Sequence, residues 1–247
     1  MKVIPLSEGS FTIDKTKIFV PFDVEKDDLQ QRPIGSLLVE VQPFCVITNN
    51  DILLIDTGLG FSINNEPQIY ANLQANNIQP HQITKVLLSH LHKDHAGGIS
   101  FRNNIGHYSI AFPNATYYVQ KQEFEFAMNT GFPSFITDEF AILYNHPNVV
   151  WLNGNGVIDN YIHYFITGAH SPYHQVFFIK ETNETIFFGG DDAPQLQQMK
   201  SKFIAKYDYD GKKSMQLRQE WWQKGNDENW KFLFYHDIKK PVFQKQA

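Results

Sequence analysis

The sequence predicts a mixed α/β protein in which helices cover layered β-sheets. Short apolar or β-branched runs of strand length recur along the chain, and helix-like stretches separate several of them. Two of these runs, residues 52–55 (ILLI) and 86–88 (VLL), are apolar throughout, which is typical of strands buried on both faces. Strands that alternate with helices in this way are typical of a layered α/β architecture.

The individual elements follow from these runs in chain order. Strands are predicted over residues 37–41, 45–48, 52–55, 86–88, 116–119, 163–166, 176–179, 185–188 and 232–235. A helix is predicted over residues 66–76, where Ile69, Leu73 and Asn76 share one face, and another over 120–128, where Phe124 and Met128 are four residues apart. Residues 138–144 and 215–222 also have helical character.

The chain of 247 residues is long enough for one large domain or two small ones. No Gly/Ser-rich or Pro-rich linker, low-complexity tract or short repeat divides the sequence. We therefore expect a single domain over residues 1–247. Residues 127–150 form an aromatic-rich excursion from the strand pattern, which could be a lid or a packed insertion.

Composition and charge exclude several classes of protein. With 26 acidic against 21 basic residues, the formal net charge is -5, which argues against a general nucleic-acid binder. The single cysteine, Cys45, rules out an internal disulfide framework and a thiolate-rich metal site. No stretch approaches the ~20 apolar residues of a membrane span, and the N-terminal apolar stretch is too short for a signal peptide. We therefore expect a cytoplasmic protein that does not bind membranes.

The most informative motif is residues 86–98 (VLLSHLHKDHAGG), in which an apolar run ends in four potential metal ligands, His90, His92, Asp94 and His95. On a continuing strand, His90 and His92 would share a face, and a turn after them lets Asp94 and His95 point back to the same region. This arrangement suits two adjacent metal ions. Imidazole and carboxylate groups are ligands suited to Zn²⁺. The alternative is an accidental polar loop.

Three later strand runs also end in candidate ligands. His170 follows residues 163–166, Asp191 follows 185–188, and His236 follows 232–235. Metal-binding side chains directly after apolar strands are what a site on the rim of a sheet requires. The sequence therefore predicts that these residues meet the cluster at 90–95.

The ordered set of motifs resembles that of the metallo-β-lactamase-fold hydrolases. The resemblance rests on SHxHxDHxGG at 89–98, LIDTG at 54–58 and the later His170, Asp191 and His236, and it extends over about residues 37–238. It implies a four-layer αβ/βα sandwich, in which two mixed β-sheets face each other and two zinc ions lie at one edge. It also implies that His90, His92 and His170 hold the first zinc, that Asp94, His95 and His236 hold the second, and that Asp191 bridges them.

Within this family, the closest resemblance is to the acyl-homoserine lactonase and organophosphate hydrolase branch. Asp191 stands where the antibiotic-hydrolysing branches carry cysteine or serine, and His92 stands where flavodiiron oxidoreductases carry glutamate. HSPYHQ at 170–175 and YHDI at 235–238 are similar to motifs of the lactonases. Those enzymes carry a carbonyl-polarising tyrosine where this chain has Pro194. Tyr173 or Tyr209 could take its place.

The resemblance implies a dinuclear zinc-dependent hydrolase that opens a lactone or cleaves a related carboxylic ester. A hydroxide shared by two zinc ions ~3.5–4 Å apart would attack the carbonyl carbon, with Mn²⁺ or Fe²⁺ as substitute metals. Asp94 would orient the hydroxide and pass its proton to the leaving alkoxide. Asp56 is the expected outer partner of a ligand histidine, with His174 and Asp237 as weaker candidates.

Two other functions stay open. A phosphoric ester or phosphotriester hydrolase would use the same metals but needs a pocket with cationic or aromatic walls. A non-catalytic binding protein of the same fold would hold metal poorly. We expect a small-molecule substrate. An acyl pocket for it could be lined by Phe19, Phe22, Phe132 and Phe135. A homodimer is possible.

Overall fold

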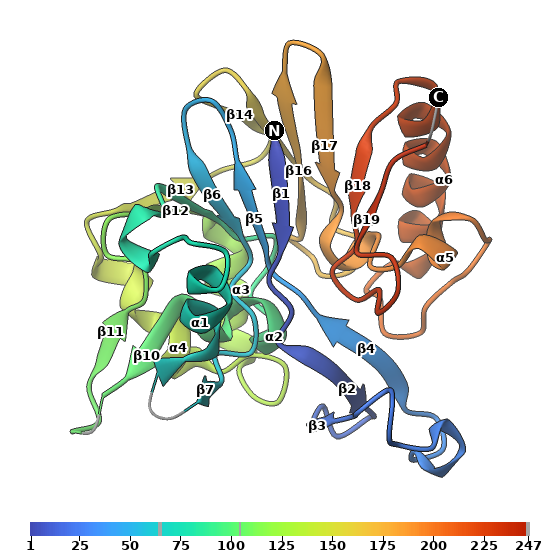
Figure 1. Cartoon of the computed structure of the whole chain (residues 1–247), viewed down its shortest axis with the longest axis horizontal. Helices are drawn as coiled ribbons and strands as arrows, with labels where there is room; N and C mark the ends of the chain where they lie inside the picture. Colours follow the sequence, from blue (N-terminus) through green and yellow to red (C-terminus); the bar gives the residue numbers. More distant parts are fainter. Residues whose placement is uncertain (64–65, 104, 246–247) are drawn as a thin grey trace.

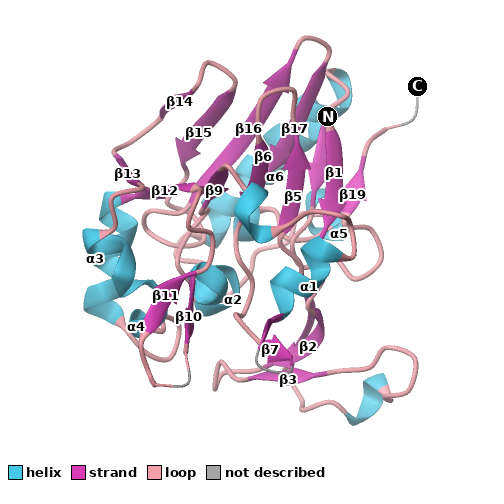
Figure 2. Ribbon diagram, turned by 60° about the vertical axis from the view of Figure 1, so that its left-hand side comes forward, coloured by secondary structure: helices cyan, strands magenta, loops and turns pink. Residues whose placement is uncertain are grey.

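Two six-stranded sheets face each other in the computed structural model, which describes residues 1–63, 66–103 and 105–245 (Figures 1 and 2). The first sheet has the order β1 (Lys2–Pro5), β5 (Phe44–Ile47), β6 (Ile52–Ile55), β9 (Lys85–Leu87), β12 (Thr116–Gln120) and β13 (Val149–Leu152). The second has the order β14 (Gly156–Ile158), β15 (Ile162–Ile166), β16 (Gln175–Glu181), β17 (Glu184–Phe188), β18 (Lys231–Leu233) and β19 (Val242–Phe243). Both sheets are mixed, since β6, β9, β12 and β13 run parallel in the first, and β17 and β18 in the second.

Alternate side chains of each central strand face different layers. Leu53 and Ile55 of β6 point into the core between the sheets, whereas Leu54 faces the helices outside. Phe177 and Phe178 of β16 divide in the same way between the inner core and the outer side of the second sheet. Because successive side chains of a strand point to opposite faces, only strands apolar throughout can be buried on both sides.

Helices cover the two outer faces. α1 (Gln68–Gln74) and α3 (Lys121–Thr130) pack on the first sheet through Ile69, Leu73 and Phe124. α6 (Gly211–Asp227) packs on the second sheet through Trp221 and Trp222 (Figure 1). The resulting order of helix, sheet, sheet and helix confirms the predicted four-layer αβ/βα sandwich.

Short elements complete the described chain. The other strands are β2 (Gly9–Ile13), β3 (Phe19–Pro21), β4 (Leu37–Val41), β7 (Ser62–Ile63), β8 (Glu66–Pro67), β10 (Ser100–Arg102) and β11 (Tyr108–Ile110). The short helices are α2 (Lys93–Ala96), α4 (Thr137–Phe140), α5 (Leu196–Met199), η1 (Leu29–Gln31), η2 (Pro80–Gln82), η3 (Gly97–Ile99), η4 (Ala141–Asn145) and η5 (Gly190–Asp192). None of the helices in the described ranges is long and apolar enough to cross a bilayer.

The N-terminal strands were not predicted. β2 pairs with both β3 and β4 in a separate three-stranded sheet that projects below the sandwich in Figure 1. Only β4 has the apolar run from which a strand is predicted, whereas β2 contains a glycine and two small polar residues, and β3 is three residues long. The helix predicted over 66–76 begins only at Gln68, because residues 66–67 pair with β7 and Pro67 precedes the first turn.

The segment 127–150 is packed against the first sheet. Its side chains Phe135, Phe140 and Leu143 lie in the core on the helical side of that sheet. Val149 and Val150 begin β13, which extends the sheet parallel to β12.

Candidate metal centre

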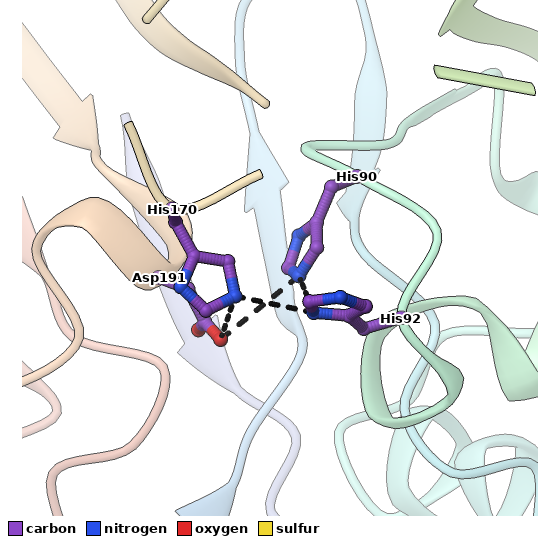
Figure 3. Close-up of side chains that lie close together, drawn as sticks. All are labelled: His90, His92, His170 and Asp191. Carbon is purple, nitrogen blue, oxygen red and sulfur yellow. Dashed lines mark hydrogen bonds and ion pairs between the residues drawn. The ribbon is translucent and has the colours of Figure 1, made fainter. Parts of the chain in front are cut away.

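All seven predicted ligands lie together at one end of the sandwich, in segments that follow four of its strands. His90 and His92 follow β9, and α2 carries Asp94 and His95. The other three follow strands of the second sheet, namely His170 after β15, Asp191 after β17 and His236 after β18. In Figure 3, His90 and His92 approach from one side, and His170 and Asp191 from the other.

The first group consists of His90, His92, His170 and Asp191, whose ligand atoms lie within 4.8 Å of one another. Nδ1 of His92 lies 2.9 Å from Nε2 of His90 and 3.1 Å from Nε2 of His170. Oδ2 of Asp191 lies 3.2 Å from Nε2 of His170 and 3.9 Å from Nε2 of His90. Three imidazole nitrogens and one carboxylate oxygen therefore face a common point.

The second group consists of Asp94, His95 and His236. Oδ1 of Asp191 lies 3.1 Å from Nε2 of His95 and 3.0 Å from Nε2 of His236. Oδ2 of Asp94 lies 3.7 Å and 3.5 Å from the same two nitrogens. Asp191 thus presents one carboxylate oxygen to each group.

Three of the imidazoles are oriented by an acceptor that faces their Nδ1 atom. Nδ1 of His95 lies 2.8 Å from Oδ2 of Asp56, Nδ1 of His170 lies 2.9 Å from Oδ1 of Asp208, and Nδ1 of His236 lies 2.6 Å from the carbonyl oxygen of Glu40. Because these oxygens can only accept, Nδ1 of each of these three rings donates, and Nε2 is the atom that faces the cluster and would coordinate a cation.

Two buried atoms of the cluster lack hydrogen-bond partners among the described residues. They are Nε2 of His95 and Oδ1 of Asp191, which both point to the second group. Unpaired buried polar atoms are costly, and a cation between them would satisfy both. The nitrogen and oxygen donors of the two groups therefore fit divalent cations such as zinc.

Asp56 organises the base of the site. It is fully buried at the end of β6, where Oδ1 accepts from the backbone N–H of Ser89 at 2.7 Å and Oδ2 accepts from the hydroxyl of Ser89 at 2.7 Å. Since that hydroxyl donates to Asp56, its oxygen is free to accept from Nδ1 of His90 at 3.0 Å. One carboxylate thereby orients a histidine of each group.

A second layer of acidic side chains ties the later loops together. Asp192 accepts from the backbone N–H of His170 at 2.8 Å and lies 3.0 Å from Nδ1 of His174. Glu123 on α3 accepts from the backbone N–H of Leu91 at 3.1 Å and from the hydroxyl of Ser171 at 3.2 Å. These contacts join the loop after β9 to the loops after β15 and β17.

The other two outer candidates make different contacts. Nε2 of His174 accepts from the backbone N–H of Asp191 at 3.2 Å, and its ring lies against that of His90, with centroids 4.9 Å apart. Asp237 accepts from the backbone N–H groups of Leu196, Lys239 and Lys240, so it supports two turns instead of an imidazole. Sequence reasoning missed Asp208, because no strand or motif precedes it.

The pKa values of the ligand histidines shift in two directions. Burial, followed by the neighbouring imidazoles, lowers the pKa of His90 and that of His92 well below the ordinary value. Burial also opposes a charge on His95, but Asp191 and Asp94 outweigh it and raise the pKa of His95 well above the ordinary value. Burial favours neutral Asp191, yet His236, His95 and His170 hold its pKa well below the ordinary value, so Asp191 is an anion.

The glycine pair of the motif is required for close packing. Gly97 donates to the carbonyl oxygen of Gly58 at 2.9 Å, and a Cβ atom on Gly97 would lie 2.4 Å from the carbonyl oxygen of Leu59. A Cβ atom on Gly98 would lie 2.1 Å from the carbonyl oxygen of Thr57. The loop that carries Asp56 therefore lies directly against the end of α2.

A pocket of about 870 Å³ opens over the metal-ligand side chains. One wall is apolar and comes from β4 and the loop after α5, including Leu37, Leu38, Val39, Phe203 and Ile204. Of the four phenylalanines considered for an acyl pocket, only Phe19 lines it. Phe135 instead packs beneath His92, with ring centroids 4.9 Å apart, and Phe132 is largely exposed.

Tyr207 is the aromatic hydroxyl that lines this pocket, and sequence reasoning missed it. Its ring meets that of His170 edge-on at 6.0 Å, and burial raises its pKa to about 12. Neither of the two candidates, Tyr173 and Tyr209, lines the pocket. Tyr173 packs on Phe126 outside the pocket lining, and Tyr209 is 71% exposed and also outside it.

Comparison with curated proteins gives relatives of one kind. The N-acyl homoserine lactonase AttM of Azorhizobium caulinodans is 30% identical over 121 residues, which are 44% of this chain and 41% of that protein. AttM of Rhizobium johnstonii is 26% identical over 144 residues, which are 53% of this chain and 49% of that protein. The matched part is therefore less than half of these relatives' own length.

Solved structures share the whole fold. A probable metal-dependent hydrolase from Staphylococcus aureus superposes with a TM-score of 0.79 at 20% identity, covering 98% of this chain and 91% of that one. AidC, a dizinc quorum-quenching lactonase solved with a homoserine product, gives a TM-score of 0.74 at 19% identity and covers 99% and 90%. The sequence profile of the Metallo-beta-lactamase superfamily matches residues 38–219. Since that match spans well over half of the sequence, the chain belongs to the metallo-β-lactamase superfamily.

Proposed function

We propose that this chain is a dinuclear zinc-dependent hydrolase that opens a lactone or cleaves a related carboxylic ester. The observation that carries the proposal is the carboxylate of Asp191, which directs Oδ2 to one group of histidines and Oδ1 to the other. The lactonase relatives and the dizinc lactonase of the same fold support it.

The residues that would hold the metals are His90, His92 and His170 for one ion and Asp94, His95 and His236 for the other, with Asp191 shared. Two zinc ions would supply a nucleophilic water and a Lewis acid for the substrate carbonyl, and Mn²⁺ or Fe²⁺ could replace them.

Two residues of the chain would act on the substrate itself. Asp94 lines the pocket, where its carboxylate would take the proton of the attacking water and pass it to the leaving alkoxide. Tyr207 lines the same pocket and keeps its proton at neutral pH, so its hydroxyl would donate a hydrogen bond to the carbonyl oxygen as that oxygen gains charge.

The apolar wall supports a substrate with a hydrocarbon part. Leu37 and Leu38 of β4 line the pocket together with Phe203 and Ile204 of the loop after α5. In a lactone the leaving alkoxide stays attached to the product, so this wall would hold the ring and its substituent through the reaction.

One observation favours phosphoric ester or phosphotriester hydrolysis as the second candidate. The pocket is lined by four lysines and by Phe19, which supply the cationic and aromatic walls that such a substrate requires. The carboxylic ester remains the first proposal because the curated relatives are lactonases.

A substrate panel with the zinc-loaded chain tests the proposal. We expect hydrolysis of lactones and aryl carboxylic esters with kcat/KM well above that for phosphotriesters, and loss of all activity after chelation. A faster reaction with phosphotriesters would favour the second candidate. Protein that binds well under one equivalent of metal and hydrolyses nothing would be the binding protein considered above.

A further inference from the structure

We propose that the pocket contains a lysine-lined subsite that binds an anionic substituent of the substrate, remote from the ester bond. The inference rests on the proposed function, which it deepens by naming the class of substrate. The preferred substrate would be a lactone or ester with an apolar body and an ionised carboxylate.

The charged residues that line the pocket support an anionic subsite. Its basic residues are Lys15, Lys17, Lys93 and Lys206. Its acidic residues are Asp14, Asp94 and Asp191, and the last two belong to the metal-ligand groups. The pocket is therefore cationic outside the metal centre, although the whole chain has a formal charge of -5.

None of the four lysines has a carboxylate partner within ion-pair distance in the part of the chain that the structure describes. The lysines that do form such pairs are Lys26, Lys85, Lys121, Lys224 and Lys231, which lie elsewhere. Four ammonium groups at one concave surface repel one another, and that repulsion is relieved when an anion enters.

Local contacts order the segments that carry three of these lysines. Asp14 accepts from the backbone N–H of Thr16 at 2.9 Å through its side chain, and from that of Lys17 at 3.0 Å through its carbonyl, which fixes the turn that carries Lys15 and Lys17. Lys93 begins α2, between His92 and Asp94, and its Nζ lies 5.7 Å from the ring centroid of Phe19.

The lysines come from three separate segments that line the pocket. Lys15 and Lys17 come from the turn between β2 and β3, Lys93 from α2, and Lys206 from the loop that also carries Tyr207. The apolar side chains of β4 line the same pocket. A neutral acyl chain would use only the apolar wall, whereas an acyl chain that ends in a carboxylate would use both.

Matched esters test the subsite in the zinc-loaded protein. The anionic substrates are 4-nitrophenyl hemiesters of glutaric, adipic and suberic acid, and the neutral controls are their methyl diesters. We expect kcat/KM to be about tenfold or more higher for the best hemiester, because a charge-assisted contact is worth roughly that factor. This preference should shrink as salt rises from about 0.02 to 0.5 M.

Variants locate the effect. Lys17→Gln, Lys93→Gln and Lys206→Gln should each reduce the ratio of hemiester to diester kcat/KM several-fold. The matched control is Lys121→Gln, since Lys121 is 64% exposed on α3, away from the pocket, and only 3.9 Å from Glu125 in a surface pair. An equal loss of preference in the control, or an unchanged ratio in all three pocket variants, would overturn the proposal.

A binding measurement tests the anionic subsite independently of hydrolysis. Calorimetric titration should show that hexanesulfonate binds several-fold more tightly than hexan-1-ol, and that Lys93→Gln removes the difference. Equal binding overturns the anionic subsite but leaves the hydrolase intact. Tighter sulfonate binding by a protein that hydrolyses no ester or lactone supports the subsite and refutes the proposed function. Faster turnover of 4-nitrophenyl phosphate than of any hemiester would place the anion at the reacting centre and overturn a separate subsite.

Discussion

Replacing Asp56 with asparagine tests whether the hydrogen bonds of this buried carboxylate orient the histidines that would bind metal. Oδ1 of Asp56 accepts from the backbone N–H of Ser89, and an asparagine oxygen can keep this bond. Oδ2 accepts from the hydroxyl of Ser89 and from Nδ1 of His95, and the amide NH₂ that replaces it can accept from neither.

The structure gives the size of the effect. Two buried donors lose their acceptor, and at about 1–3 kcal/mol each the loss of stability without metal is at most about 6 kcal/mol, because protons that rearrange restore part of it. The new amide would donate to Nδ1 of His95 and move the proton of that ring to Nε2, the atom that faces the cluster. The hydroxyl of Ser89 would turn toward His90, 3.0 Å away, with the same consequence. We expect zinc affinity to fall about 10- to 100-fold.

The assay combines urea unfolding of the metal-free protein with zinc competition against a chromophoric chelator. Asp51→Asn is the matched control, because Asp51 lies at the other end of β6 and accepts from Thr84, Lys85 and Tyr161, far from the metal-ligand side chains. This control should lose stability but keep its zinc affinity. Wild-type zinc affinity in Asp56→Asn would refute the proposed orienting role.

Three further predictions concern the shared ligand, the pocket and a buried acid. Asp191→Ala should lower metal content and abolish hydrolysis; an active variant that retains two metals, measured by elemental analysis, would contradict its bridging role. Tyr207→Phe should lower kcat about 10- to 100-fold with little change in metal content, as loss of one donor to a developing charge predicts, and steady-state kinetics would show it. Burial raises the pKa of Glu8 from 4.5 to about 8, so the folded protein keeps a proton that the unfolded chain releases. The bound proton stabilises the folded state fully below pH 4.5, and this stabilisation is lost as the pH rises through about 8. The loss in the free energy of unfolding is about 5 kcal/mol in total, at about 1.4 kcal/mol for each pH unit. In urea unfolding measured between pH 5 and 8, Glu8→Gln should remove this pH dependence of the free energy of unfolding. The same pH dependence in the wild type and the variant would contradict the prediction.

Much of the fold could be predicted because apolar periodicity is a local property of the sequence. Leu53, Leu54 and Ile55 are all apolar, so β6 could be placed between two layers before the layers themselves were known. The four-layer arrangement itself came from the resemblance. β2 and β3 escaped prediction because their stability comes from pairing with β4, which a short polar run does not reveal.

The site was predicted where chemistry coincides with strand ends. His90, His92, Asp94 and His95 are neighbours in sequence, and each later ligand follows a recognisable strand. Tyr207 and Asp208 could not be found in this way, because they reach the site only after the loop beyond α5 folds back toward His170. Lys15 and Lys17 were missed because they belong to no motif and line the pocket only through the turn between β2 and β3.

The central claim is that seven side chains hold two metal ions that share Asp191. A crystal of the zinc-loaded protein, measured at the zinc absorption edge, tests it most directly. We predict two anomalous peaks ~3.5–4 Å apart, one among His90, His92 and His170 and the other among Asp94, His95 and His236, with an oxygen of Asp191 on each. A single peak, or a pair of peaks that does not contact Asp191, would contradict it.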